Sequence, residues 1–133
     1  MQPVDSLPLN TMLSAVREVR IEAAMEQTRA VRDFYDTVFD LRPRRPNSAP
    51  GFVGGWIVDS KPRLCFMWRH DPVVFAQRPR VRLLVDSMGE LIARLTRLEH
   101  PFTLRHEIQL GARVLYLNDP VGHLIEVRQF TAI

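Results

Sequence analysis

The residues of this chain whose types and spacing can do chemistry are glutamates and arginines that alternate along β-like segments. Glu126 and Arg128 lie two residues apart near the end of the chain, and Arg80 and Arg82 have the same spacing in its middle. Residues two apart in a strand point to the same face of the sheet. A carboxylate can hold a divalent metal or move a proton, whereas a guanidinium stays protonated and binds anions. The spacing therefore indicates a face that gathers both kinds of group, to which a third stretch adds Glu18, Arg20 and Glu22.

The chain repeats itself at an offset of 60 residues, and this repeat predicts how those side chains come together. Asp59 recurs as Asp119, Arg20 recurs as Arg80, and apolar positions follow the same offset from about residue 18 to residue 128. Two copies are too few for a solenoid. The repeat instead predicts two similar halves, with a site formed where the halves face each other.

The apolar residues predict the same order of elements in both halves. A strand of period two is followed by an amphipathic helix and then by further short strands. The class is therefore α+β, with a first βαβββ module at 16–72 and a second at 73–133 in one structural domain. A counterpart of the 103–108 strand belongs within the connection 42–50 or directly after it, where the signal is weak because of the prolines. We expect helices at 27–39 and 91–98, and strands at 19–23, 52–58, 63–68, 80–86, 103–108, 113–117 and 123–130.

Composition is typical of a soluble globular domain. The chain has 133 residues, of which 46% are hydrophobic and 25% charged. Its single cysteine, Cys65, excludes an internal disulfide, so we expect a reducing, cytoplasmic location. It lacks both an apolar run of membrane-spanning length and the pattern of a signal peptide, so we expect no membrane partner. Residues 1–15 are expected to form a loose N-terminal leader, with a short helical turn near Met12 and Leu13.

The positive charge of the chain is almost entirely arginine. The net charge is +3, and Lys61 is the only lysine. The arginines are spread along the chain between acidic residues instead of forming one stripe, so nucleic acid is not an expected partner. Arginine forks match carboxylates and phosphates, which favours a small anionic ligand.

Two stretches of the sequence resemble one known superfamily. Residues 29–41 read Arg-Ala-Val-Arg-Asp-Phe-Tyr-Asp-Thr-Val-Phe-Asp-Leu, and residues 116–127 read Tyr-Leu-Asn-Asp-Pro-Val-Gly-His-Leu-Ile-Glu-Val. They are similar to the first helix and the closing hairpin of the vicinal oxygen chelate proteins, which include glyoxalase I, the bleomycin-resistance proteins and the extradiol dioxygenases. The resemblance implies two βαβββ modules in a curved mixed sheet, with helices on the convex face and a ligand cavity on the concave face. It also implies a homodimer.

The same resemblance implies one divalent metal, held by the first and last strands of each module. Only one of the four matching positions, Glu126, carries a lone pair for a metal. A two-residue insertion would bring Glu18 to the first position, and a one-residue shift would bring Cys65 to the second. We therefore expect no metal cofactor, with Glu126 and Glu18 as the ligands if a divalent metal is bound. The four positions themselves read Arg20, Phe66, Arg80 and Glu126.

Without a metal, Glu126 is expected to lie between Arg20 and Arg80, because a desolvated carboxylate needs charge compensation. Arg82 shares the predicted face, and the alternative for all three arginines is an ordinary solvated position. A further set of residues is predicted to wall an aromatic slot, with core packing or a dimer contact as the alternative. That set is Trp56, Phe66 and Trp68.

Two histidines lie on or beside predicted strands. His123 is expected to be packed or to cap a turn. His106 lies on the 103–108 strand, from which it could reach the cavity, although isolated histidines are more often structural.

Three functions are open at this point. The favoured one is a metal-free binding protein for a small aromatic or anionic molecule, with Arg20, Arg80, Arg82, Trp56, Phe66 and Trp68 as ligand-binding residues. The second is a metal-dependent lyase, isomerase or dioxygenase of the same superfamily, with Glu126 as its catalytic residue and a metal that polarises the paired oxygens of a substrate. The third is a non-catalytic module whose concave face binds another chain.

Overall fold

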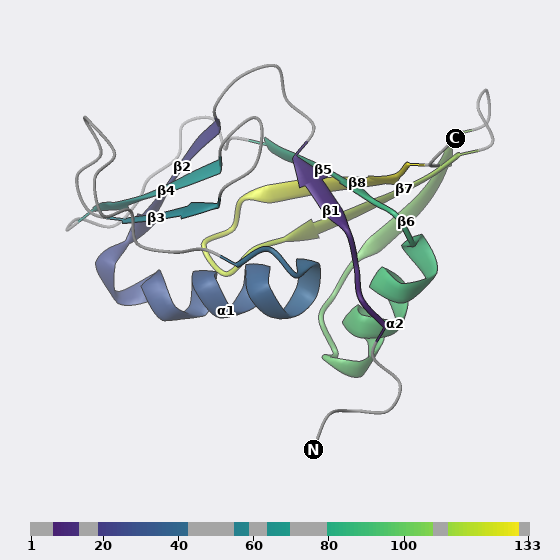
Figure 1. Ribbon diagram of the computed structural model, residues 1–133, viewed down its shortest axis with the longest axis horizontal. Helices are drawn as coiled ribbons and strands as arrows, with labels where there is room; N and C mark the ends of the chain where they lie inside the picture. The colour runs from purple at the N-terminus through teal and green to yellow at the C-terminus, as the bar shows by residue number, and fades with distance from the viewer. Residues whose placement is uncertain are drawn as a thin grey trace.

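The computed structural model describes residues 7–13, 19–42, 55–58, 64–69, 80–107 and 112–130, and for 19–25, 55–58, 64–69 and 112 it describes the backbone alone. These residues form two sheets and two α-helices (Figure 1). The larger sheet has the order β1-β5-β8-β7-β6, and the smaller has the order β2-β4-β3. The larger sheet is built from β1 (Thr11–Leu13), β5 (Arg80–Val85), β6 (Thr103–Glu107), β7 (Ala112–Asn118) and β8 (Leu124–Gln129). The smaller is built from β2 (Val19–Ala24), β3 (Gly55–Val58) and β4 (Leu64–Arg69).

The α+β class and the modular order are confirmed. The second half forms a complete β-α-β-β-β unit, in which α2 (Met88–Arg97) follows β5. In the first half, β2 leads through a 3₁₀ turn (Met25–Gln27) into α1 (Thr28–Phe39) and then to β3 and β4. The first strand of each half lies parallel to the last, which gives each sheet mixed strand directions. The expected counterpart of β6 falls on residues that lie, apart from Arg42, outside the described part of the chain.

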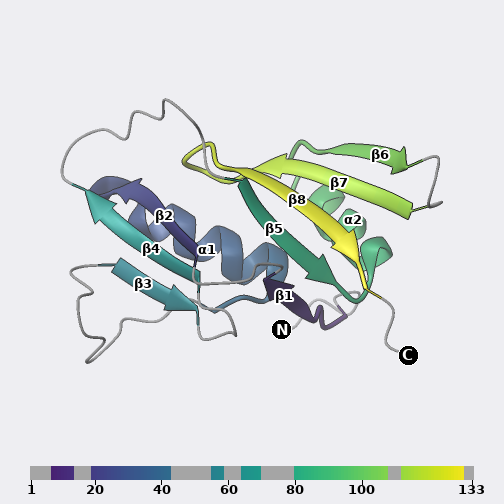
Figure 2. The ribbon, with the colours of Figure 1, turned by 90° about the horizontal axis from the view of Figure 1, so that it is seen from above.

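Both helices lie on one side of the sheets, as Figures 1 and 2 show. In α1 the buried residues recur with helical spacing, at Val31, Phe34, Tyr35 and Val38. In β5 the buried Val81 and Leu83 alternate with the exposed Arg80 and Arg82, the pattern of a strand with one face against a core. One hydrophobic core therefore joins both helices to β5, β7 and β8. Its largest fully buried side chains are Tyr35, Phe39, Leu83, Met88, Leu91, Leu95, Leu115 and Ile125.

The expectation for the N-terminal leader is wrong at Met12 and Leu13, which form part of a strand and not a helical turn. Strand β1 pairs antiparallel with β5, with Leu13 opposite Leu83. Leu13 is buried, and the Thr11 hydroxyl donates to the Phe39 carbonyl at 2.7 Å. The physical reason is the open edge of β5, whose unpaired backbone groups take up an extended segment. A three-residue strand is too short to show a period in the sequence.

A buried arginine on α2 fastens this segment to the helices. Arg94 Nε donates to Glu90 at 3.1 Å, and its Nη2 donates to Asp40 at 3.0 Å and also to the Leu7 carbonyl. Burial alone would raise the pKa of Asp40, but hydrogen bonds from Arg94 and from the Leu9 backbone lower it below its usual value. Arg94 therefore links α1, α2 and the N-terminal segment through one side chain.

The repeat is one residue out of step in the first strands. Strands β4 and β8 keep the offset, because Leu64 and Leu124 both begin their ladders. Leu124 pairs with Arg80, but Leu64 pairs with Val19 and not with Arg20. The position in β2 that corresponds to Arg80 is thus Val19, so the equivalence of Arg20 and Arg80 is wrong by one residue. The register depends on which residues pair between strands, and this pairing cannot be read from an offset in the sequence.

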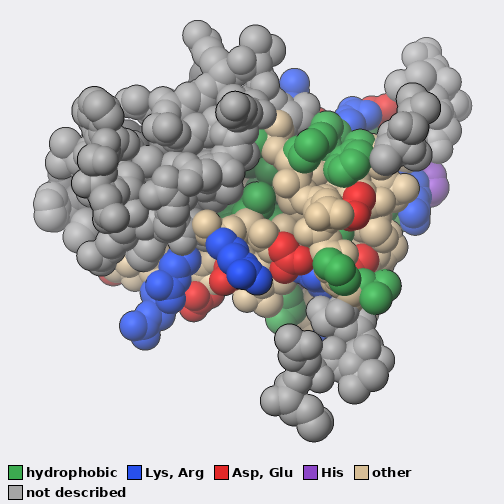
Figure 3. Space-filling view, viewed as in Figure 1, with side chains coloured by type: hydrophobic (Ala, Val, Ile, Leu, Met, Phe, Trp, Pro, Cys, Tyr) green, Lys and Arg blue, Asp and Glu red, His purple; other side chains and the backbone are tan. Residues whose placement is uncertain are grey.

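The outer surface of α1 carries acidic and basic side chains side by side, which Figure 3 shows along the lower edge of the molecule. Arg32 and Asp33 are one such exposed pair, with 3.5 Å between Nη2 and Oδ1. No helix within the described ranges is long and apolar enough to cross a membrane.

Candidate functional site

The charged side chains that could bind a ligand lie on the face of the larger sheet that is turned away from the helices. Strand alternation places Arg80 and Arg82 on this face, because Val81 and Leu83 point into the core. Strand pairing then aligns Arg82 with Glu126, and Glu126 with Tyr116, in one row across β5, β8 and β7.

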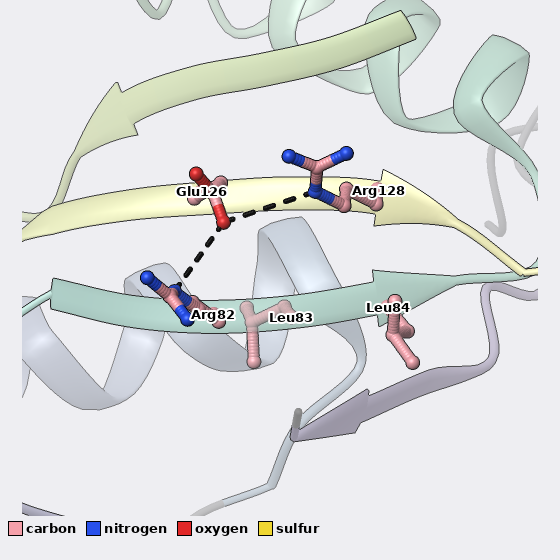
Figure 4. A pocket seen from close by; sticks show the side chains of 5 residues that line it. All are labelled: Arg82, Leu83, Leu84, Glu126 and Arg128. Atoms are coloured by element: carbon pink, nitrogen blue, oxygen red, sulfur yellow. Dashed lines mark ion pairs between the residues drawn. The ribbon is translucent and has the colours of Figure 1, made fainter. Parts of the chain in front are cut away.

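Glu126 is the centre of this face. Its side chain is only 9% exposed, yet three guanidinium groups lie around its carboxylate. Arg80 Nη1 lies 3.5 Å from Oε1, Arg82 Nε lies 3.4 Å from Oε2, and Arg128 Nε lies 3.9 Å from Oε2. The Tyr116 hydroxyl donates to Oε1 at 3.3 Å. Figure 4 shows Arg82 and Arg128 on either side of the carboxylate, from β5 and β8.

Charge continues outward toward β6. Arg128 Nη2 donates to Glu107, and this bond lowers the pKa of Glu107 and raises the pKa of Arg128. Arg105 lies over the Tyr116 ring, with 5.7 Å from its guanidinium carbon to the ring centre, a cation–π arrangement. Arginine is thus the prevailing charged residue of this face.

A shallow pocket opens between these groups. It has a volume of about 240 Å³ and is lined by Arg82, Leu83, Leu84, Glu126 and Arg128 (Figure 4). Two guanidinium groups and one carboxylate give its lining a net positive charge of one. Leu84 adds an apolar wall next to them.

The side chains described around Glu126 do not fit the divalent metal that the resemblance implies. A metal site needs several lone-pair donors, and protonated guanidinium groups have none. Within the ranges given above, no three residues of the types His, Cys, Asp and Glu are grouped so that they could hold a metal ion. We therefore derive no chemistry that passes through a metal at this place.

The structure brings together three of the predicted site residues, Arg80, Arg82 and Glu126. Tyr116 was missed, although it and Glu126 lie equally far from the ends of the β7–β8 turn and therefore had to face each other. Glu18 lies outside the described residues. For Arg20, Trp56, Phe66 and Trp68 only the backbone is described, in β2, β3 and β4.

His123 is packed, as predicted. It is fully buried, and its Nδ1 lies 2.7 Å from Oδ2 of Asp119. The other oxygen, Oδ1, accepts backbone N–H bonds from Val121, Gly122 and His123, which closes the turn.

Burial and the neighbouring Asp119 raise the pKa of Tyr35, whose hydroxyl donates to the same carboxylate at 2.9 Å. These groups hold the fold together on the helix side of the sheet, away from Glu126.

The suggestion that His106 reaches the cavity is wrong. In β6 the neighbouring Arg105 pairs with Val114, and Val114 pairs with Arg128 on the arginine-bearing face. Successive residues of a strand point to opposite faces, so His106 is directed to the other side of the sheet.

No protein-family model matches the chain, and no curated protein does. Solved structures do match over most of their length. A protein assigned to the glyoxalase family, from Bacillus anthracis, aligns with a TM-score of 0.69 and 16% identity, over 89% of this chain and 96% of that one. A lactoylglutathione lyase from Agrobacterium tumefaciens aligns with a TM-score of 0.63 and 20% identity, over 87% of this chain and 93% of that one. For the oxidase ChaP-H1 the TM-score is 0.62 and the identity 16%, over 88% and 96%. The chain therefore has the fold of the vicinal oxygen chelate proteins, and at these identities the likeness shows the fold alone.

Proposed function

We propose that this chain binds a small organic anion on the arginine-bearing face of its larger sheet, with Arg80, Arg82 and Arg128 as the binding residues and without a metal between protein and ligand. The observation that carries the proposal is the placement of three guanidinium groups within 4 Å of the nearly buried Glu126 carboxylate. A divalent cation would be repelled by this arrangement, whereas an anion is attracted to it.

The arrangement leaves binding capacity for a second anion. The contacts of Arg82 and Arg128 with Glu126 are made through Nε, and a guanidinium has five N–H donors in a fork. Both side chains remain partly exposed, at 59% and 38%. Glu126 contacts Arg82 through Nε, so both Nη atoms of Arg82 can donate to an incoming carboxylate. Arg128 uses Nη2 for Glu107 and has Nη1 to offer, so the ligand meets charged donors that are already oriented.

The test is calorimetric titration of the purified protein with sodium acetate and sodium benzoate, together with one substitution in the site and one matched control. Arg82→Gln should weaken binding roughly tenfold, because it removes a charge-assisted contact. Arg113→Gln replaces an exposed arginine of β7, directed to the opposite face next to His106, and should leave the affinity unchanged. Higher salt should also weaken binding. Equal losses in both variants would overturn the proposal.

A further inference from the structure

We infer that the anion is an organic monocarboxylate with an apolar part, and that the N-terminal strand β1 supplies the apolar half of its site. This inference rests on the proposed function and adds to it the class of ligand and a strand that the sequence repeat does not include.

Strand pairing places apolar side chains beside the arginines. Met12 pairs with Leu84 across β1 and β5, and Leu84 pairs with Arg128 across β5 and β8. Residues that pair directly share a face of the sheet, so Met12, Leu84 and Arg128 form one row. The adjacent row begins with Arg82 and Glu126. The pocket lies between these rows, and its apolar lining comes from Leu83 and Leu84 of β5. Met12 extends the row of Leu84 by one strand beyond the pocket.

The exposure of Met12 fits a binding wall better than a core position. Met12 is 48% exposed, whereas its neighbour Leu13 is only 8% exposed. Methionine is flexible and polarisable, and it adapts to apolar ligands of different shapes. An exposed methionine in the row of Leu84 and Arg128 therefore matches a ligand that is apolar at one end and anionic at the other.

The charges of the lining favour a monoanion over a phosphate dianion. Arg82, Arg128 and Glu126 sum to one positive charge, which a carboxylate neutralises. A phosphate monoester would bring close to two negative charges beside the Glu126 carboxylate, and the repulsion would oppose its binding.

The experiment titrates the protein with acetate, butyrate, hexanoate, hexanol and methyl phosphate at constant ionic strength. We expect affinity to rise roughly two- to fourfold for each added methylene between acetate and hexanoate, as for burial of a CH₂ group. Hexanol and methyl phosphate should each bind more weakly than hexanoate. Met12→Ser should flatten the rise along the series, while Leu98→Ser, which changes a similarly exposed leucine after α2, should preserve it.

Each other outcome separates the two proposals. Equal affinities for acetate and hexanoate, or a rise that Met12→Ser leaves intact, would overturn the inference about β1 and leave the anion site standing. Tighter binding of methyl phosphate than of hexanoate would overturn the monocarboxylate. Hexanol that binds as tightly as hexanoate, or a complete lack of carboxylate binding, would overturn the anion site as well.

Discussion

The Tyr35 hydroxyl donates a 2.9 Å hydrogen bond to Asp119, and this bond joins α1 to the turn between β7 and β8. Tyr35 belongs to the helix stretch and Asp119 to the hairpin stretch on which the resemblance to the vicinal oxygen chelate proteins rests. Both partners are buried, and Asp119 also closes its own turn and contacts His123. The two recognisable motifs therefore form one structural contact, on the opposite side of the sheet from the arginine-bearing face.

Removing the Tyr35 hydroxyl should destabilise the protein without affecting the site. Tyr35→Phe takes one donor from a buried carboxylate, and we expect a loss of about 1–3 kcal/mol in the free energy of unfolding. Urea denaturation measures this loss. The matched control is Tyr116→Phe, which removes a hydroxyl from a longer, partly exposed contact and should change stability by about 0.5 kcal/mol or less. If both variants lose the same free energy of unfolding, the contact between Tyr35 and Asp119 does not have the larger stabilising role predicted for it.

The same tyrosine predicts a stability change at high pH. Burial and Asp119 raise the pKa of Tyr35 in the folded protein, whereas in the unfolded chain it titrates near about 10. Above about pH 10 the unfolded state has lost a proton that the folded state keeps, so the free energy of unfolding falls as pH rises. Urea denaturation between pH 8 and about 11 should show a steeper fall for the native protein than for Tyr35→Phe. Parallel curves would contradict the assignment.

The amphipathic elements could be predicted because each one buries a single face. In β5 the buried Val81 and Leu83 alternate with arginines, and in α1 Val31 and Val38 recur at helical spacing. In both elements the residues that the period places on one face are the buried ones. Arg82 and Glu126 could be placed on one face for the same reason. The two side chains meet because β5 pairs in parallel with β8, and the closing motif determines this pairing only in part.

The parts that could not be predicted depend on contacts between segments far apart in the sequence. Strand β1 forms because the edge of β5 is open, and three residues carry no period of their own. Arg94 looks like an ordinary solvated residue of an amphipathic helix, yet it is 6% exposed because α1 and the N-terminal segment meet over it. The slip between Val19 and Arg20 likewise follows from strand pairing.

Arg94 should contribute more to stability than its neighbour Arg97. Arg94→Ala leaves Glu90, which is 7% exposed at its side chain, without its nearest guanidinium, and a buried pair broken in this way costs about 3 kcal/mol or more. The control is Arg97→Ala, because Arg97 contacts the same Glu90 oxygen at 3.4 Å from a more exposed position. Its loss should be below about 1 kcal/mol. Urea denaturation compares the two, and a larger loss for Arg97→Ala would contradict the role of Arg94.

Glu126→Gln separates anion binding from metal binding most directly. If the face binds an anion, the substitution removes a negative charge beside the ligand carboxylate while keeping the shape of the side chain. Two charges about 4 Å apart in a water-like medium interact by about 1 kcal/mol, so carboxylate affinity should rise roughly fivefold. If Glu126 were a metal ligand, the same substitution would lower metal content and weaken any ligand held through the metal. Calorimetric titration with benzoate and elemental analysis of the same samples give both readouts. A Glu126→Gln protein that loses both a stoichiometric metal and its benzoate affinity would contradict the metal-free site.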